Sequence, residues 1–445
     1  MALAVAGCGT KSDSGPGGGS TPDAGMGLFH NAPGEMDGAM STHGGGDFDA
    51  SALLDANAPN CKPTHLKKAD LLFVVDDSNS MREEQAALKD QFPKLIQALV
   101  SGKRSANDPH PFPPLEDLHL AVVSVNMGLI GVNGIPGCSG YGDDGVFQHT
   151  ATNGDATCKA SYPPFLAYQA GGSQTPEQLA SDFGCVAELG TDGCGFEQQL
   201  ESPLKALWPS IDVDPLTGQT ISPNRITFLT DGTDAMRKLG HGDRENQGFL
   251  RRDPNDPSLL GIVMVTDEED CSSSVTKHFT PANFLDPSDP LYAQDLNLRC
   301  FYNPQNLYPV ERYVKGFQAL HEGNKQLVVY AAIVGVPPDL VDAQARKMVD
   351  FKDAASRDAY YTKLLGDPRM QEVPDPARPM GQGRLMPSCD TPTGVAFPPR
   401  RLVKVAQAMG ENGIVQSICQ SDFSPALDAI IDKLGERLTE TCVVQ

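Results

Sequence analysis

The segment from residue 70 to residue 101 constrains the fold of this chain more than any other. It opens with a segment at 70–75 that is apolar throughout after Asp70, typical of a strand buried on both faces of a parallel sheet, and the segment ends in Asp-Asp-Ser-Asn-Ser at 76–80. A helical stripe of large apolar residues follows: Leu88, Phe92, Leu95 and Leu99. Pro93 lies inside this stripe and is expected to bend the helix or end it early. The segment therefore predicts a strand, an acidic loop rich in hydroxyls and a helix in direct succession.

The rest of the chain repeats the alternation of strand and helix. Further strands are predicted at residues 118–125, 260–266, 327–335 and 413–419. Helices are predicted at residues 197–207, 310–321, 400–409 and 425–438. Such alternation is typical of an α/β fold with a doubly wound, mostly parallel central sheet flanked by helices. We expect this domain to span residues 61–445.

The loop at 76–80 carries oxygen ligands in a regular spacing. Alternate residues of a tight turn point the same way, so the carboxylate of Asp76 and the hydroxyls of Ser78 and Ser80 can converge on one hard cation. In an open α/β sheet this loop lies at the carboxyl ends of the strands, where ligand crevices form. The alternative interpretation is a helix N-cap, a role that Asp and Ser also fill well.

The Asp-x-Ser-x-Ser pattern, placed between an apolar strand and an amphipathic helix, resembles the metal-ion-dependent adhesion site of von Willebrand factor A domains. The resemblance implies a divalent cation, with Mg²⁺ expected first and Ca²⁺ or Mn²⁺ as alternatives. It also implies a threonine from a second loop, for which Thr191 is the candidate, and an aspartate after a later strand. Asp267 is preferred for that aspartate because it follows the long apolar run at 260–266, and Asp231, in Thr-Asp-Gly, is the alternative.

The same resemblance implies a function in binding, in which an acidic side chain of a protein partner completes the coordination of the cation. The alternative is a structural protein of the cell envelope whose scaffold a metal stabilises, with no open ligand site. Enzymatic activity is not expected, because Ser78 is not part of a Gly-x-Ser-x-Gly elbow and the histidines form no His-Glu-x-x-His cluster. The acidic run at 268–270 could add a second cation site, but we interpret it as a solvated loop.

The net charge of −22 excludes a nucleic-acid partner. Eleven cysteines contain no Cys-x-x-Cys pair, which argues against zinc and for disulfides made in an oxidising compartment. The ten disulfide candidates are Cys61, Cys138, Cys158, Cys185, Cys194, Cys271, Cys300, Cys389, Cys419 and Cys442. Pairing between neighbours in the sequence would join Cys138 to Cys158, Cys185 to Cys194 and Cys271 to Cys300, although the sequence does not fix the connectivity.

The remaining cysteine, Cys8, ends the sequence Val-Ala-Gly-Cys, which resembles a bacterial lipobox. The resemblance implies that residues 1–8 are a residual signal and that Cys8 carries a lipid anchor, in an outer-membrane or cell-surface lipoprotein. Residues 9–60 hold twelve of the forty-four glycines and are predicted to be a disordered tether. Insertions fastened by disulfides are expected near 126–185, 209–258 and 336–398, where Gly, Pro, Asp and Asn are frequent.

Overall fold

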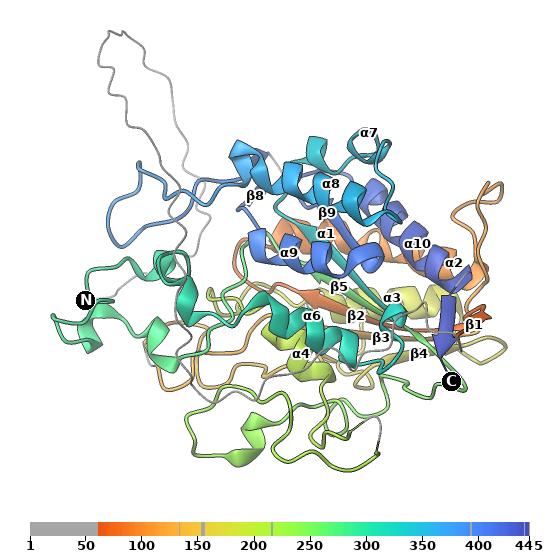
Figure 1. The fold of residues 1–445 in the computed structure, drawn as a ribbon, viewed down its shortest axis with the longest axis horizontal. Coiled ribbons are helices and arrows are strands. Elements are labelled where there is room, and N and C mark those ends of the chain that lie inside the picture. Colours follow the sequence, from red (N-terminus) through yellow and green to blue (C-terminus); the bar gives the residue numbers. More distant parts are fainter. Residues whose placement is uncertain are drawn as a thin grey trace, which may run out of the picture.

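A six-stranded sheet forms the centre of the protein (Figure 1). The computed structural model describes residues 61–132, 134–152, 156–214, 217–391, 394–439 and 441–444. The strands of the sheet are β2 (Lys68–Val75), β3 (Asp117–Ser124), β4 (Leu166–Gln169), β5 (Leu259–Val265), β6 (Val328–Val334) and β9 (Gly413–Ser417). Their order is β4-β3-β2-β5-β6-β9, and every neighbouring pair is parallel except β3 with β4. The predicted α/β fold with a mostly parallel sheet is confirmed.

The order of the strands contains one reversal. Counted along the chain, the six strands lie in the order 3-2-1-4-5-6, so the chain winds outward in one direction from β2 and in the other from β5. Connections that diverge in this way leave a crevice at the carboxyl ends of the two central strands. The loops that follow β2 and β5 therefore meet at this switch point.

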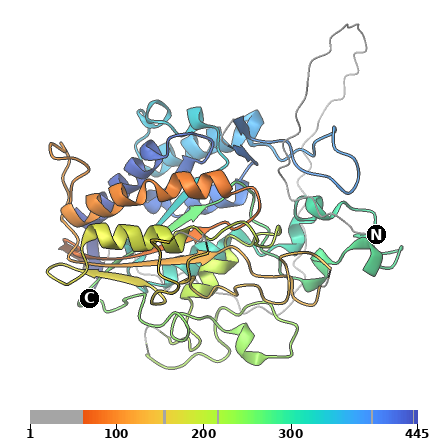
Figure 2. The ribbon, with the colours of Figure 1, turned by 180° about the vertical axis from the view of Figure 1, so that it is seen from behind.

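Helices cover both faces of the sheet (Figures 1 and 2). One face packs against α1 (Arg82–Lys89), α2 (Phe92–Ser101), α3 (Pro176–Ala187) and α10 (Ser424–Thr439). The other packs against α4 (Glu201–Leu207), α6 (Val310–Ala319), α8 (Ala354–Gly366) and α9 (Arg400–Ala408). Strand β2 serves both cores, because Leu71, Phe73 and Val75 enter the first while Leu72 and Val74 enter the second.

The other elements are short. They are α5 (Arg299–Tyr302), α7 (Ala343–Arg346), the antiparallel pair β1 (Cys61–Thr64) and β10 (Thr441–Val444), and the hairpin of β7 (Cys389–Thr391) and β8 (Gly394–Ala396). The break between α1 and α2 confirms the prediction for Pro93, which lies in the first turn of α2, where a missing N–H costs nothing. The helix predicted from residue 197 begins at Glu201, after a turn at 199–200.

Two of the three predicted insertions also contain strands and helices of the fold. The segment 126–185 contributes β4 and most of α3, and 336–398 contributes α7, α8, β7 and β8. Between 209 and 258, the described residues form only one short 3-10 helix, Ala235–Lys238. Residues 225–229 form no strand, so Asp231 does not follow one.

Four disulfides join described residues: Cys138–Cys194, Cys158–Cys185, Cys271–Cys300 and Cys389–Cys419. The pairing of Cys271 with Cys300 is confirmed. The pairings of Cys138 with Cys158 and of Cys185 with Cys194 are wrong, because the fold places the loop of Gly137 on the backbone of Gly193, where a Cβ on Gly137 would lie 2.4 Å from the carbonyl oxygen. Cys442 is disulfide-bonded as well.

This density of disulfides is that of a protein made in an oxidising, extracytoplasmic compartment. Within the described ranges, none of the helices has the length and apolar character needed to cross a lipid bilayer. The predicted signal remnant with Cys8, the tether at 9–60 and the side chain of Cys61 lie outside the described residues.

Candidate cation site at the switch point

The loop after β2 holds its side chains in a tight turn. The backbone N–H of Ser78 donates to Oδ1 of Asp76 at 2.8 Å, and the hydroxyls of Ser78 and Ser80 lie 3.1 Å apart. Asp76 is fully buried, and its N–H donates to the carbonyl of Val265 at the end of β5. The structure thus brings the three residues of the Asp-x-Ser-x-Ser pattern together, directly against the neighbouring strand.

The loop after β5 supplies the next two residues. The hydroxyl of Thr266 donates to Oδ2 of Asp76 at 2.6 Å, so the two loops are joined through this carboxylate. Asp267 follows and is 1% exposed, yet neither of its carboxylate oxygens has a hydrogen-bond partner. Buried carboxylates are normally paired, because a solitary one is costly to remove from water. The unpartnered oxygens of Asp267 are therefore the most unusual feature of the apex.

Like charges crowd the same place. Burial raises the pKa of Asp267 well above its usual range, and the carboxylates of Asp76 and Glu268 raise it further. Burial raises the pKa of Asp76 too, although the hydrogen bonds from Thr266 and Ser78 oppose the shift. The pKa of Glu197, which is 2% exposed and has an unpartnered Oε1, is also raised well above normal, by burial and by Glu268 and Asp76. When ionised, these groups repel one another, and either protonation or a positive charge among them would remove the repulsion.

Thr191 is held near the first loop by a glutamine. The side chain of Gln85, in α1, donates to the carbonyl oxygens of Asp76 at 2.7 Å and of Gly190 at 2.9 Å, and its Oε1 accepts from the N–H of Gly190. Arg82 donates to the hydroxyl of Thr191 at 3.3 Å. No local pattern pointed to Gln85, since a polar residue on an amphipathic helix is normally expected to face solvent.

The contact between the loop after β2 and the loop that carries Thr191 also depends on a glycine. The N–H of Gly193 donates to the carbonyl of Asp77 at 2.9 Å, and a Cβ on Gly193 would lie 2.3 Å from the carboxyl carbon of Asp77. Only glycine allows so close an approach. Asp77 is itself buried, and its Oδ1 has no partner. Burial and the neighbouring Asp76 and Asp143 raise its pKa well above normal.

Asp231, the alternative to Asp267, lies elsewhere. It is exposed, and its Oδ1 accepts from the hydroxyls of Tyr141 and Thr233. These hydrogen bonds lower its pKa, the largest contribution coming from Thr233. The structure therefore brings Asp267, rather than Asp231, to the strand beside Asp76.

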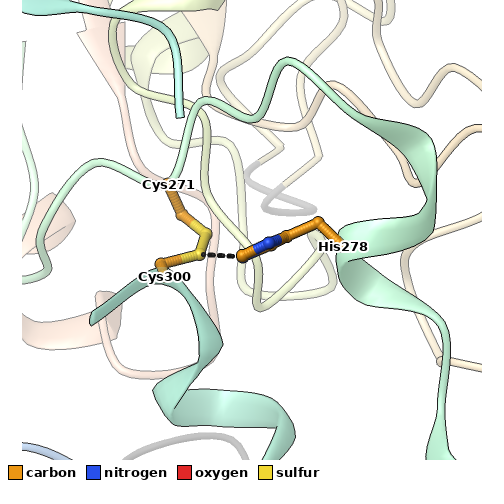
Figure 3. A group of neighbouring side chains, drawn as sticks. All are labelled: Cys271, His278 and Cys300. Carbon is orange, nitrogen blue, oxygen red and sulfur yellow. Dashed lines mark hydrogen bonds between the residues drawn. A yellow bond between two sulfur atoms is a disulfide. The ribbon is translucent and has the colours of Figure 1, made fainter. Parts of the chain in front are cut away.

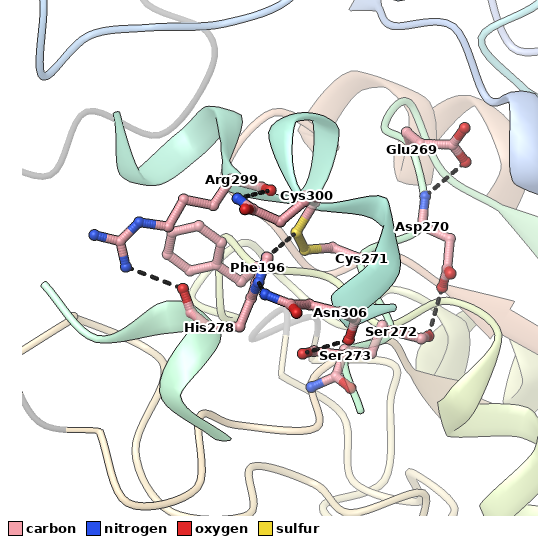
Figure 4. The surroundings of a disulfide bond; sticks show 12 residues. Phe196, Glu269, Asp270, Cys271, Ser272, Ser273, His278, Arg299, Cys300 and Asn306 are labelled. Carbon is pink, nitrogen blue, oxygen red and sulfur yellow. Dashed lines mark hydrogen bonds between the residues drawn. A yellow bond between two sulfur atoms is a disulfide. The ribbon is translucent and has the colours of Figure 1, made fainter. Parts of the chain in front are cut away.

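The acidic run after Asp267 is not the solvated loop that we expected. Asp270 is fully buried, and it accepts from the N–H of Leu200, the hydroxyl of Ser272 and the guanidinium of Arg401. Glu269 accepts from the N–H of Arg401 and also from the N–H of Asp270, the second of which Figure 4 shows. The interpretation failed for these two residues because their partners come from α4 and α9, far away in the sequence. They tie the apex to the helices.

A cavity of about 910 Å³ opens beside the loop after β2, the loop after β5 and the loop that carries Thr191. Ser78, Ser80 and Thr191 line it, together with Glu197 and Glu268. Its other walls come from two of the insertions, from loops at 196 and 301–307 and from α9, and they include Ile135, Phe196, Phe301, Leu307, Phe397 and Lys404. Asp76 and Asp267 are buried and are not among the residues that line the cavity.

The donor set fits a hard cation. Asp76, Asp267, Ser78, Ser80 and Thr191 offer carboxylate and hydroxyl oxygens, the ligands that Mg²⁺ and Ca²⁺ prefer. A separate cluster of Cys271, His278 and Cys300 does not fit a metal as it stands, although its ligand atoms lie within 4.8 Å of one another. Its two sulfurs form a disulfide, and Figure 3 shows Nε2 of His278 directed at the sulfur of Cys300, at 3.3 Å. A metal would require thiolates there.

Fold and site together define a disulfide-rich α/β protein with an acidic, hydroxyl-lined apex at the switch point of an open sheet, consistent with a von Willebrand A-like fold. No protein family and no curated protein matches the sequence. Among solved structures, the chain is similar to proximal thread matrix protein 1 (PTMP1) from the mussel byssus, with 9% identity over 61% of this chain and a TM-score of 0.20. The match covers 39% of that protein, and so weak a likeness carries no argument about fold or function.

Proposed function

We propose that this protein binds a divalent cation at the switch point and uses it to hold an acidic group of a protein partner. The observation that carries the proposal is Asp267, a fully buried carboxylate with no partner for either oxygen, next to the carboxylate of Asp76. One cation would satisfy both groups and remove their repulsion. Asp76, Ser78, Ser80, Thr191 and Asp267 would hold it, either directly or through water.

The cavity favours an open site over a purely structural one. Ser78, Ser80 and Thr191 face a space large enough for a ligand, whereas a cation that only stabilised the fold would need no such access. When bound, Mg²⁺ supplies a hard Lewis-acidic centre for a carboxylate oxygen of the partner. The residues of the chain position that centre, and we propose binding rather than catalysis.

The test is calorimetric titration of Mg²⁺, Ca²⁺ and Mn²⁺ into the chelator-stripped chain. We expect about one bound ion in the native protein and none in Asp76→Asn, which keeps the shape of the side chain and removes its charge. Asp231→Asn is the matched control and keeps the ion, because Asp231 lies away from the cavity. Equal binding in Asp76→Asn and the native protein, or no binding in either, would overturn the proposal.

The proposal extends to a lipid anchor at Cys8, on the envelope surface of a bacterial cell. The Val-Ala-Gly-Cys sequence supports it, and the disulfides agree with an extracytoplasmic location. Metabolic labelling with an alkyne fatty acid would test it. The label should appear on the native chain and be absent from Cys8→Ser.

A further inference from the structure

The cavity has a second side that the cation does not use. Besides the hydroxyls, large apolar groups line it, among them Ile135, Phe196, Phe301 and Leu307. Phe196 and Leu307 belong to a small apolar core that is separate from the two cores of the sheet, with Ile135 packed against it. This core is built from segments around 129–138, 194–196 and 271–307, so it belongs to the loops and insertions of this chain rather than to the sheet.

Two disulfides fix this apolar wall in place. Cys138–Cys194 joins the first segment to the second, and Cys271–Cys300 closes the third. Figure 4 shows Phe196 beside the second disulfide, with Glu269 and Asp270 on the other side of it, so the same link borders both the wall and the acidic loop. Phe196 also packs against Phe279, with ring centroids 5.3 Å apart. A wall held in this way exists before a ligand arrives, which reduces the entropy lost on binding.

The start of α9 adds basic groups to the lining of the cavity. Lys404 is exposed and makes no ion pair among the described residues, although its charge acts on Glu372, while Arg401 is held by Asp270. A divalent cation would offset the charges of Glu197 and Glu268, and together with Lys404 it would let the cavity accept a negatively charged ligand. Its volume of about 910 Å³ suits a few residues of a protruding chain rather than a flat protein surface.

We infer that the partner inserts a protruding polypeptide segment in which an acidic residue adjoins a large apolar one. The acidic side chain goes to the cation, and the apolar side chain packs on the wall formed by Ile135, Phe196, Phe301 and Leu307. The inference rests on the proposed function and adds the chemical class of the ligand. The apolar wall then selects among acidic partners, which the cation alone cannot do.

The experiment uses capped tetrapeptides as probes and calorimetry with the full chain in saturating Mg²⁺. Two probes place aspartate next to phenylalanine, one in each order, and a third places aspartate among glycines. We expect the better of the two phenylalanine peptides to bind at least tenfold more tightly than the glycine peptide, because burial of a phenyl ring supplies that much or more. In chelator, none of the three binds.

The variant that tests the wall is Phe301→Ala, since Phe301 is only partly buried and can be truncated without opening a core. It should reduce the preference for the phenylalanine peptide to about twofold or less. Phe284→Ala is the matched control, because Phe284 is 63% exposed and does not line the cavity, and it should keep the full preference.

The outcomes separate the two proposals. Each variant is first titrated with Mg²⁺ alone, so that peptides are compared on cation-loaded protein. If the native chain binds Mg²⁺ but the three peptides bind equally, or if the preference survives Phe301→Ala, this inference is wrong and the cation site stands. If the native chain binds no cation, the proposed function fails and this inference falls with it.

Discussion

Asp70 and Asp267 lie at opposite ends of the two central strands, and both are almost completely buried. Asp70, near the start of β2, accepts from the N–H and Nε of Arg251 and from the hydroxyl of Ser258, at 2.7–3.0 Å. Asp267, just after β5, has no donor within hydrogen-bond geometry of either oxygen, and the nearby hydroxyl of Ser80 only partly opposes the rise in its pKa. Burial alone would raise the pKa of Asp70, but His119 and Arg251 outweigh it and lower the value, whereas the pKa of Asp267 is raised.

The difference separates two uses of a buried acid. The carboxylate of Asp70 has a complete set of partners within the chain, so its charge is part of the folded structure. The carboxylate of Asp267 lacks such a set and repels Asp76, so its environment is complete only with something that the chain does not supply. The charge at the first end of the sheet is therefore satisfied within the fold, and the second end is where we propose that a cation binds.

The largest effect should come from removing the charge of Asp70. Asp70→Asn leaves the guanidinium of Arg251, whose side chain is 17% exposed, without its buried acid and with only the partly exposed Asp117 as an ion-pair partner. We expect the free energy of unfolding to fall by about 3 kcal/mol, the order found when one member of a buried ion pair is removed. Urea unfolding in the presence of chelator would measure it. A loss below about 1 kcal/mol would mean that this end of the sheet does not depend on the pair.

A buried histidine whose pKa Asp70 influences, His321, should make the stability of this end of the sheet depend on pH. Burial lowers the pKa of His321 to about 4, and Nε2 of its ring has no hydrogen-bond partner. The unfolded chain takes up the proton near pH 6.5, so the stability due to neutral His321 is complete at high pH and is lost as the pH falls from 6.5 towards 4. The lowered pKa of Asp70 keeps Asp70 ionised throughout this window.

The measurement is the difference in unfolding free energy between the native chain and His321→Gln at several pH values. Between pH 7 and pH 5 this difference should shift by about 2 kcal/mol to the disadvantage of the native chain. The comparison of two chains cancels the carboxylates that titrate in both. A difference that does not vary with pH would show that His321 titrates normally.

The opposite behaviour is expected of Asp267. In chelator, Asp267→Asn removes an unpartnered and repelled charge, so the unfolding free energy should rise or stay within about 1 kcal/mol of the native value. Thermal and urea unfolding would both report it. A loss as large as that of Asp70→Asn would show that Asp267 has a structural partner, and the contrast between the two ends would disappear.

The smallest effect is expected at an exposed pair. Lys67 and Glu116 lie 2.7 Å apart, a distance like those around Asp70, but their side chains are 60% and 57% exposed. Water screens such a pair, so Lys67→Ala should change the unfolding free energy by less than about 0.5 kcal/mol. A larger change in the same urea experiment would mean that contact distance, and not burial, governs the charges of this protein.

The sequence predicted what local patterns determine. The central strands are long apolar runs because both of their faces are covered, so β2, β5 and β6 could be predicted to within a residue or two at each end. The choice of Asp267 over Asp231 rested on the same argument, and the structure places Asp267 after β5 and Asp231 in an exposed loop. The role of these residues in binding a cation stays a prediction.

Other features depend on contacts between distant segments and left no local signal. Strand β4 has only four residues, and it pairs with β3 from within a stretch that looks like a loop. The partners of Cys138 and Cys185 are set by which loops the fold brings together. The same holds for Gln85, whose side chain bonds loops on either side of it, and for Asp270, whose partners come from α4 and α9.

The most direct test of cation binding at Asp267 is to measure how much Mg²⁺ raises the unfolding free energy of the native chain and of Asp267→Asn. At a free concentration of 100 times the dissociation constant, a ligand that binds only the folded state adds about 2.7 kcal/mol. If a cation binds at Asp267, the native chain and Asp231→Asn should both show that gain, and Asp267→Asn should gain less than about 0.5 kcal/mol. No gain in the native chain, or an equal gain in Asp267→Asn, would contradict it.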